Sequence, residues 1–186
     1  MAFFWTAQYT LGDMENKDCI VALSSLDEEK YPISKLQSQF DAVEEINLEL
    51  AIQLSTSPSP GDGHANINAL IRNKIMIALT VYYTACSSRS PYLPGMYTEK
   101  EEIFLDFITE CGKATYLEYL AVLPEFQRTG AGSALIKQAE LDSLAAGSNI
   151  LFAVDFGRDN HRFYKKNGFE FSEPHFYWKE IENKSL

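Results

Sequence analysis

Residues 116–124 read YLEYLAVLP, and after two residues the chain continues at 127–136 with QRTGAGSALI. The first stretch is mostly apolar and stops at a proline, as a buried strand does. The second stretch opens with two closely spaced glycines and continues with residues that favour a helix. The first N–H groups of a helix have no intrahelical partner, and the helix dipole places positive charge there. The sequence therefore predicts a strand, a glycine turn and a helix N-terminus that suits a phosphate group.

Two common nucleotide-binding motifs do not fit this glycine turn. The P-loop motif GxxxxGK[ST] needs a lysine directly after its second glycine, whereas the next lysine here is Lys137. The dinucleotide fingerprint GxGxxG needs a third glycine where this chain has Leu135. The remaining pattern is Q-x-x-G-x-G, formed by Gln127, Gly130 and Gly132. Taken alone, it is also compatible with an ordinary turn.

The residues after the turn continue as alternating helix and strand. Apolar residues recur at helical spacing up to Gly147, which closes the predicted helix. Residues 149–154 (NILFAV) form an apolar run typical of a strand buried on both faces. Residues 158–169 (RDNHRFYKKNGF) predict a short helix, which Asp159 or Asn160 caps and Asn167-Gly168 ends.

Together, residues 115–179 resemble the GNAT superfamily, the Gcn5-related N-acetyltransferases. The coenzyme A loop of that family has the form [QR]-x-x-G-x-[GA] after a V-x-P-like turn, here Val122-Leu123-Pro124, and its last helix carries a signature like N…FY-x-K-x-GF. The resemblance implies an α/β fold of the α+β type, in which helices flank both sides of one mixed central sheet. We expect a single domain over residues 1–186, with an acceptor-side half (1–114) and an acetyl-CoA-binding half (115–179).

The resemblance also implies where the coenzyme binds. In the family, the strands that correspond to residues 115–122 and 149–155 are parallel neighbours that separate at their ends, and the pantetheine arm lies in the gap. The coenzyme-binding residues expected from the resemblance are Leu120, Ala121, Val122, Gln127, Arg128, Thr129, Gly130, Ala131, Gly132, Ser133, Asn160, Phe163 and Tyr164. For Asn160, the alternative is a simple helix cap.

A general base is the first catalytic residue to look for, because an amine with a pKa near 10.4 is protonated at neutral pH. Glu118 is the first candidate, and strand alternation places it on one face with Tyr116, Leu120 and Val122. Enzymes of the family often carry a base about two residues earlier, where this chain has Tyr116. Asp155 is the reserve candidate. The alternative for Glu118 is a solvated residue, or one that only orients the acceptor.

A proton donor for the leaving thiolate is the second catalytic residue, and Tyr164 matches the tyrosine that often has this role in the family. A phenol is a weaker acid than a thiol, so the transfer needs a lowered phenol pKa or coupling to bond cleavage. The alternative is a core aromatic residue between Phe163 and Phe169. No cysteine fits a covalent intermediate, so we expect direct transfer from donor to acceptor.

The composition sets limits on the class of protein. At 186 residues and 46% hydrophobic content, one compact domain is the default. No apolar run reaches the roughly 18 residues of a membrane span. No basic region precedes the apolar residues 1–5, so we expect no secretory signal. Cys19, Cys86 and Cys111 form no CxxC pair, which favours free thiols in a reducing compartment and argues against a metal. We therefore expect a cytoplasmic protein with no metal and no membrane partner.

The formal net charge of −10 argues against a nucleic-acid partner, which would require a basic surface. It is compatible with a cationic amine acceptor. The reading that we favour is that most of this charge lies on solvated helix faces, such as the acidic side of the predicted helix that begins at Thr98.

The N-terminal half gives fewer signals. We expect a strand at 19–23, a helix from Ser34 to Leu54, a loop at 55–63 and a strand at 75–86. Thr98-x-x-Glu101 is a capping box for a further helix that Gly112 closes. This helix departs from the family pattern, so residues 91–114 are a predicted insertion before the coenzyme-binding strand.

The function expected from these observations is transfer of an acetyl group from acetyl-CoA to a primary amine. The acceptor is a small molecule or a protein, so a lysine or N-terminal acetyltransferase is one alternative. The other is a non-catalytic module of the same fold that only binds acyl-CoA. A homodimer is compatible with either function.

Overall fold

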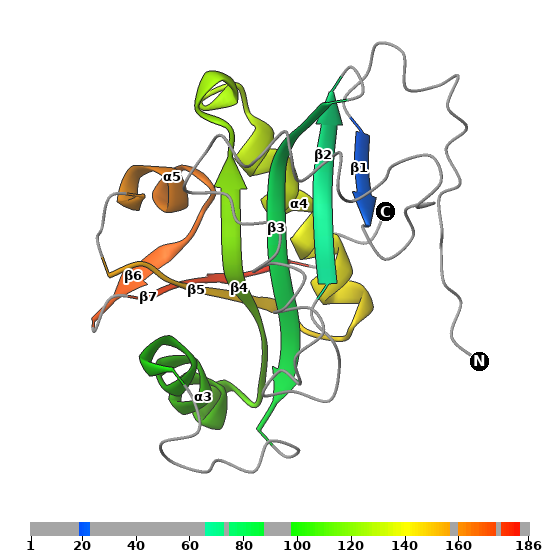
Figure 1. The fold of residues 1–186 in the computed structure, drawn as a ribbon. Helices are drawn as coiled ribbons and strands as arrows, with labels where there is room; N and C mark the ends of the chain where they lie inside the picture. The colour runs from blue at the N-terminus through cyan, green and yellow to red at the C-terminus, as the bar shows by residue number, and fades with distance from the viewer. Residues whose placement is uncertain are drawn as a thin grey trace, which may run out of the picture.

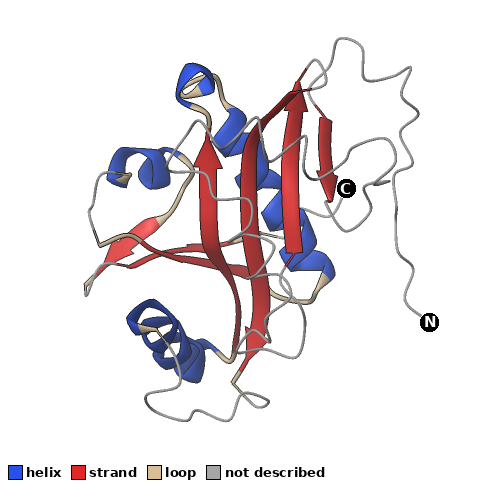
Figure 2. Ribbon diagram, in the orientation of Figure 1, coloured by secondary structure: helices blue, strands red, loops and turns tan. Residues whose placement is uncertain are grey.

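The computed structural model describes residues 19–22, 66–72, 75–87, 98–156, 160–173 and 176–182. These residues form a seven-stranded sheet with helices against both faces (Figure 1) (Figure 2). The strands are β1 (Cys19–Ala22), β2 (Asn66–Arg72), β3 (Ile75–Cys86), β4 (Lys113–Val122), β5 (Ile150–Val154), β6 (Glu170–Ser172) and β7 (Phe176–Glu180). The helices are α3 (Glu99–Cys111), α4 (Ala131–Ala145) and α5 (His161–Lys166), with a 3-10 turn η3 (Pro124–Phe126). The predicted fold class is confirmed.

The order of strands across the sheet is β1-β2-β3-β4-β5-β7-β6. The pair β4 and β5 is parallel, as predicted, and the other neighbours are antiparallel. Because β4 and β5 are parallel, the chain between them must cross over the sheet, and α4 makes this crossing. The crossing brings the N-terminus of α4 to the end of β4.

Several elements have the predicted bounds. The strand at 75–86 is β3, and β1 covers most of the strand expected at 19–23. Thr98 caps α3 through the predicted capping box with Glu101, and Gly112 follows its last residue. The predicted helix before β4 is therefore confirmed, while its being an insertion relative to the family stays a prediction.

Other predictions were incomplete. The sequence did not predict β2, β6 or β7, and α5 is shorter than the helix expected at 158–169. In β2, the polar residue Asn68 interrupts the apolar pattern expected of a strand. Its side chain is nevertheless buried, and its amide donates to the Tyr82 hydroxyl at 2.6 Å and to Asp142 at 3.0 Å. The helix expected at 34–54 and the loop expected at 55–63 lie outside the described residues.

The core has two layers, one on each face of the sheet. On the face that α4 covers, Leu117 and Leu151 belong to one cluster with Ile136 and Ala139. On the opposite face, aromatic rings pack under α3: Phe104 stacks on Tyr116 with ring centroids 5.0 Å apart. Strand β4 therefore contributes residues to both layers, and α3 and α4 lie on opposite faces.

A β-bulge interrupts β4 at Glu118. On β3, Val81 pairs with Tyr119 and the next residue pairs with Leu117, so Glu118 is an extra residue with no partner there. Beyond the bulge the alternation is shifted: Tyr119 lies on the α3 face, whereas Leu120 lies on the α4 face. The predicted common face for Glu118, Leu120 and Val122 is therefore wrong.

None of the described helices is long and apolar enough to cross a membrane.

Candidate functional site: the opening between β4 and β5

Strands β4 and β5 pair over only three residues each, Thr115–Leu117 with Leu151–Ala153. Past this point β4 continues along β3 as far as Val122, while β5 continues along β7 (Figure 1). None of the described strands therefore pairs with the second edge of β4 from Glu118 to Val122. The predicted separation of the two strands is present, and it leaves backbone groups of β4 available to a ligand.

A cavity of about 1050 Å³ lies beside this edge of β4. It is bounded by the end of β4, the turn before α4, the first turn of α4, and α5. Its lining residues are Leu120, Ala121, Val122, Phe126, Gln127, Arg128, Gly130, Ala131, Gly132, Ser133, Asn160, His161, Arg162, Phe163, Tyr164 and Lys166. The structure thus brings together every predicted coenzyme-binding residue except Thr129.

The turn before α4 is built by its own backbone. Gly130 has φ +96° and Arg128 has φ +63°, both in the left-handed region that residues other than glycine rarely adopt. Gln127 donates from its side chain to the carbonyl of Val122 at 3.4 Å. The Thr129 hydroxyl donates to the carbonyl of Phe126 at 2.7 Å, so this side chain holds the turn together.

The N-terminus of α4 meets the requirements for an anion site. Gly130 occupies the N-cap position, and no side chain caps the helix there. Ala131, Gly132 and Ser133, whose N–H groups open the helix, all line the cavity. A Cβ atom at Gly132 would lie 3.1 Å from the Phe163 ring and 3.5 Å from Val122, so glycine lets α5 approach α4 closely. Uncapped N–H groups beside a large cavity fit the pyrophosphate of a nucleotide coenzyme.

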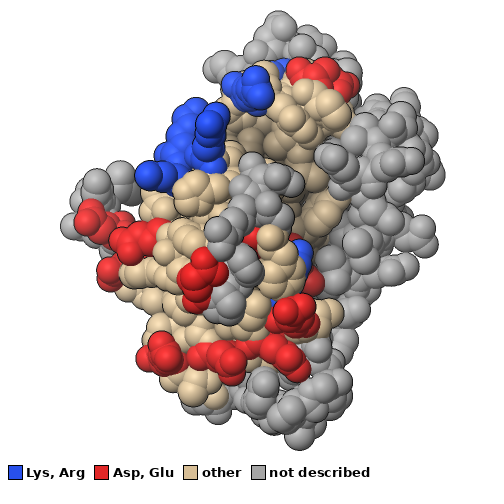
Figure 3. Space-filling model, turned by 90° about the vertical axis from the view of Figure 1, so that its left-hand side faces the viewer, with Lys and Arg blue, Asp and Glu red and all other residues tan. Residues whose placement is uncertain are grey.

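Basic side chains surround the same cavity. Arg128 comes from the turn, and Arg162 and Lys166 come from α5, where they are four residues apart and so lie on one side of the helix. Figure 3 shows Lys and Arg side chains gathered on the upper part of one face and acidic side chains along its lower part. A basic rim in a chain of net charge −10 indicates an anionic ligand.

Sequence reasoning missed four of these lining residues: Phe126, His161, Arg162 and Lys166. The pair Arg162 and Lys166 carried a usable signal, namely two cations at helical spacing in the helix that follows β5. The signal was lost among the other charges of that segment.

Asn160 lies at the N-cap position of α5, but its side chain makes no capping hydrogen bond. Asp155, which directly follows β5, caps the helix instead: its carboxylate accepts a hydrogen bond from the Asn160 backbone N–H at 3.1 Å. The Asn160 amide is thus left to the cavity, which it lines. Asp155 is engaged in holding α5, and this weakens the reserve hypothesis that it serves as a base.

Tyr164 is buried at the base of the cavity and its ring stacks on Tyr177 with centroids 4.5 Å apart. Burial raises the pKa of its phenol, and the nearby Asp155 carboxylate and Tyr177 raise it further. The surroundings of Tyr164 therefore do not lower the pKa of its phenol, as an effective proton donor would require. Tyr164 keeps its proton across the physiological range and can offer it as a hydrogen bond.

Glu118 does not line the cavity; it is partly buried on the opposite, α3 side of β4. The pKa of its carboxyl is raised from 4.5 to about 7: burial is the main cause, the Glu101 carboxylate of α3 adds to it, and Lys100 lowers the pKa. A carboxyl with a pKa near 7 can accept a proton at neutral pH and release it again, as a general base must.

The sequence of this region matches a known family of domains. Residues 96–171 match the family model of the acetyltransferase (GNAT) domain. Over these residues the sequence is therefore similar to the acetyltransferase (GNAT) domain. The match includes α3, β4, the glycine turn, α4, β5 and α5, which are the elements that surround the cavity.

Solved structures with the GNAT fold are similar to this chain over most of its length. One is a protein of the GNAT acetyltransferase family from Desulfovibrio desulfuricans, with a TM-score of 0.57 and 16% identity, covering 89% of this chain and 100% of that one. Another is NAA60 of Arabidopsis thaliana in complex with acetyl-CoA, with a TM-score of 0.54, 14% identity, and coverage of 89% and 100%. A GNAT acetyltransferase from Elizabethkingia anophelis with acetyl-CoA bound has a TM-score of 0.51, 16% identity, and coverage of 88% and 98%. Among proteins of curated function, none matches this sequence.

The described part of the chain contains no group of three or more histidine, cysteine, aspartate or glutamate side chains that could hold a metal ion.

Proposed function

We propose that this protein transfers the acetyl group of acetyl-CoA to a primary amine by direct transfer. One observation carries the proposal: β4 and β5 separate after Leu117 and Ala153, beside the uncapped N-terminus of α4. The opening offers backbone groups for an extended arm, and the helix terminus offers N–H groups for a pyrophosphate. Relatives of the same fold were solved with acetyl-CoA bound, which supports the choice of donor.

The donor would bind along the α4 and α5 side of the opening. The turn from Gln127 to Ser133 would hold the pyrophosphate, and Arg128, Arg162 and Lys166 would add positive charge around it. Backbone groups of Leu120, Ala121 and Val122 would hydrogen-bond the pantetheine arm and the thioester carbonyl, with the Asn160 amide on the other side. A backbone N–H directed at that carbonyl stabilises the negative charge of the tetrahedral intermediate.

The acceptor would approach from the α3 side, where Glu118 lies. An amine with a pKa near 10.4 must lose a proton at pH 7, at a cost of roughly 4.6 kcal/mol. Glu118, directly or through water, would take that proton and give the neutral amine, which attacks the thioester carbonyl. The nitrogen then loses a second proton to water as the tetrahedral intermediate forms. The carbon–sulfur bond then breaks, and Tyr164 would donate its proton to the sulfur as negative charge develops there. Because the Tyr164 phenol has a raised pKa, this transfer must be coupled to bond cleavage.

The experiment that tests the donor site is a calorimetric titration with acetyl-CoA. Ser133→Glu adds a carboxylate in the first turn of α4, at a position that lines the cavity. The matched control is Leu141→Glu, which adds the same charge to the same helix at a position 52% exposed and outside the cavity lining. We expect the wild type and the control to bind, and Ser133→Glu to bind at least tenfold more weakly. If the wild type does not bind acetyl-CoA, the proposal is wrong.

A screen of primary amines with acetyl-CoA then tests the transfer itself, with small amines and with peptides that carry a free N-terminus or a lysine. Acetylation of any of these amines supports the proposed enzymatic activity, and the class that reacts fastest identifies the type of acceptor. Binding of acetyl-CoA with no turnover of any amine would indicate the acyl-CoA-binding module instead. The expectation of no nucleic-acid partner stays a prediction.

A further inference from the structure

Helix α3 lies on the sheet face opposite α4, and its N-terminus reaches the end of β5 (Figure 1). The Lys100 ammonium lies over the ring of Phe156, 5.7 Å from its centroid, and Phe156 follows β5 by two residues. The first turn of α3 therefore lies close to the chain that follows β5, on the side of the opening between β4 and β5.

The capping box fixes the carboxylate of Glu101. One oxygen of Glu101 accepts from the Thr98 backbone N–H at 2.7 Å and from the Thr98 hydroxyl at 2.8 Å. In return, the Glu101 N–H donates to the Thr98 hydroxyl oxygen at 3.3 Å. An ordinary surface glutamate moves among many rotamers, whereas two hydrogen bonds hold this carboxylate. Its negative charge therefore has a defined position.

Glu118 lies beside the ring contact that joins α3 to β4. Phe104 of α3 stacks on Tyr116 of β4 with ring centroids 5.0 Å apart. Glu101 precedes Phe104 by about one helical turn, and Glu118 follows Tyr116 by two residues, at the bulge. Among the described residues, the charged side chains that act on Glu118 are Glu101 and Lys100, both from the first turn of α3. The neighbouring strands β3 (IMIALTVYYTAC) and β5 (ILFAV) carry no charged residue. On β4, Tyr116 is buried with a raised phenol pKa, so it stays neutral.

We propose that α3 supplies a positioning residue to the transfer reaction: Glu101, fixed by its capping box, sets the pH range in which Glu118 works as the base. The proposal rests on the proposed function for its meaning in catalysis, but the interaction itself can be measured in the protein alone. The repulsion between two carboxylates makes Glu118 hold a proton more tightly, and a stronger base removes a proton from an amine more readily. Lys100 opposes this effect, so the first turn of α3 carries one charge that raises the pKa of Glu118 and one that lowers it.

The test is a carbon-13 NMR titration of the glutamate side-chain carboxyl groups in the full-length protein, without acetyl-CoA or acceptor. The Glu118 signal is assigned as the one that Glu118→Gln removes. In the wild type we expect a midpoint near pH 7. Glu101→Gln removes the charge but keeps a side-chain oxygen for the capping box, so the helix is retained. We expect this variant to lower the midpoint by roughly 0.5 pH unit.

Two further variants make the result specific. Glu99→Gln removes the same charge from the same turn, and Glu99 is not among the groups that act on Glu118, so the midpoint should not move. Lys100→Met should raise the midpoint, the opposite sign to Glu101→Gln. Equal midpoints in the Glu101 and Glu99 variants would overturn the proposal. Its failure is distinct from that of the proposed function, because calorimetry with acetyl-CoA does not depend on Glu118.

Discussion

At the scale of single residues, Glu118 shows where pattern reasoning stops. Strand alternation assumes an unbroken register, and the sequence LEYL contains nothing that marks an inserted residue. The bulge is stabilised from the neighbouring strand, where the buried Thr80 hydroxyl donates to the carbonyl of Tyr119 at 2.8 Å. That contact joins residues 39 positions apart, so only the folded chain reveals it. The choice of Glu118 as candidate base came from the resemblance, and its surroundings came from the structure.

The raised pKa of Glu118 predicts a pH-dependent difference in stability. Because the folded state holds the Glu118 proton more tightly than the unfolded chain, the contribution of Glu118 to stability is full below about pH 4.5 and is lost as the pH rises through about 7. The glutamine of Glu118→Gln cannot ionise. The free energy of unfolding of this variant should therefore rise relative to that of the wild type as the pH increases through this range. We expect a relative gain of about 1 kcal/mol from pH 5 to pH 8, because solvent around the partly exposed carboxyl weakens the effect.

Urea unfolding of both proteins at several pH values measures this difference. The buffer series should be repeated with Glu99→Gln, which tests whether any loss of negative charge has the same effect. A difference that stays constant from pH 5 to pH 8 would contradict the raised pKa of Glu118.

At the scale of elements, local rules predicted what local interactions decide. The cap and the glycine that bound α3, and the apolar period of α4, are features of neighbouring residues and were read correctly. The strands β2, β6 and β7 were missed: Asn68 interrupts the apolar pattern of β2, although β2 pairs with β3, the next strand along the chain. Strands β6 and β7 are short, and their pairing with each other and with β5 decides their structure.

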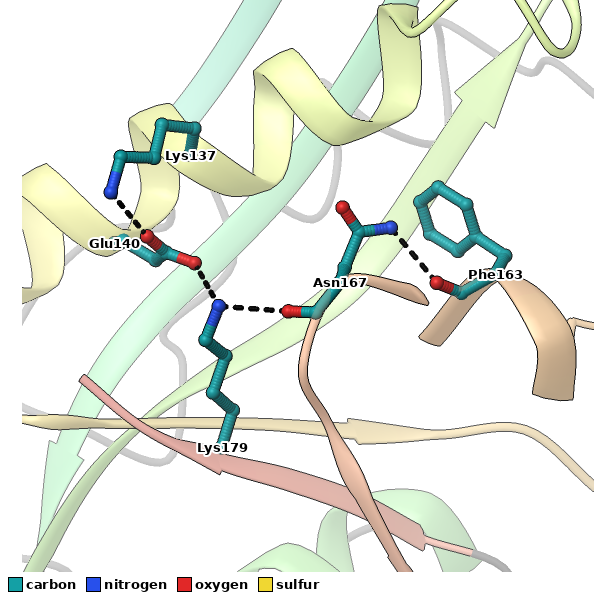
Figure 4. A network of polar contacts seen from close by, with 5 residues as sticks. All are labelled: Lys137, Glu140, Phe163, Asn167 and Lys179. Carbon is teal, nitrogen blue, oxygen red and sulfur yellow. Dashed lines mark hydrogen bonds and ion pairs between the residues drawn. The ribbon is translucent and has the colours of Figure 1, made fainter. Parts of the chain in front are cut away.

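A polar network joins α4 to β7 and to the end of α5 (Figure 4). The buried Glu140 carboxylate of α4 accepts from Lys179 of β7 at 2.6 Å and from Lys137 of α4 at 2.9 Å. Lys179 also donates to the carbonyl of Asn167 at 2.8 Å, and Asn167 donates from its amide to the carbonyl of Phe163 at 2.9 Å. The network therefore fixes the two helices that bound the cavity.

Removing the two lysines of this network should have unequal effects. Lys179 is 23% exposed and Lys137 is 71% exposed, so the pair with Lys179 is far less screened by solvent. Lys179→Met leaves the buried Glu140 with its solvent-exposed partner alone and should lower the free energy of unfolding by about 3 kcal/mol. Lys137→Met should cost less than about 1 kcal/mol.

Chemical denaturation of the two variants beside the wild type gives both values. Glu140→Gln together with Lys179→Met should recover part of the loss, because no buried charge then remains without its main partner. Equal losses in the two single variants would mean that the network does not bear on stability as proposed.

At the scale of the whole molecule, the sheet is nearly continuous but for one seam, the three-residue pairing of β4 with β5. The resemblance to a family implied this opening. Composition and periodicity could not have done so, since both strands read as ordinary buried strands. The basic residues Arg162 and Lys166 on the far side of the opening were not predicted, because the sequence does not distinguish them from the other charged residues of that segment.

The seam predicts a localised response to acetyl-CoA. Backbone N–H groups in residues 118–122 that point away from β3 have no strand partner, so they should exchange with deuterium faster than the rest of the central sheet. On addition of acetyl-CoA, we expect exchange in 118–122 to slow at least fivefold. Mass spectrometry of peptides covers this segment, with β2 (Asn66–Arg72) as the internal reference that should not change. Binding without slower exchange in 118–122 would place the ligand elsewhere.

The left-handed backbone of Arg128 has a consequence for protein engineering. An arginine with φ +63° is strained by about 1 kcal/mol relative to glycine, so Arg128→Gly should raise the melting temperature while it removes a cation from the rim of the cavity. Thermal melts and acetyl-CoA titrations of this variant should move in opposite directions. A library selected only for heat resistance would thus enrich the Arg128→Gly substitution, which weakens donor binding. Selection on this scaffold therefore needs a ligand-binding step in every round.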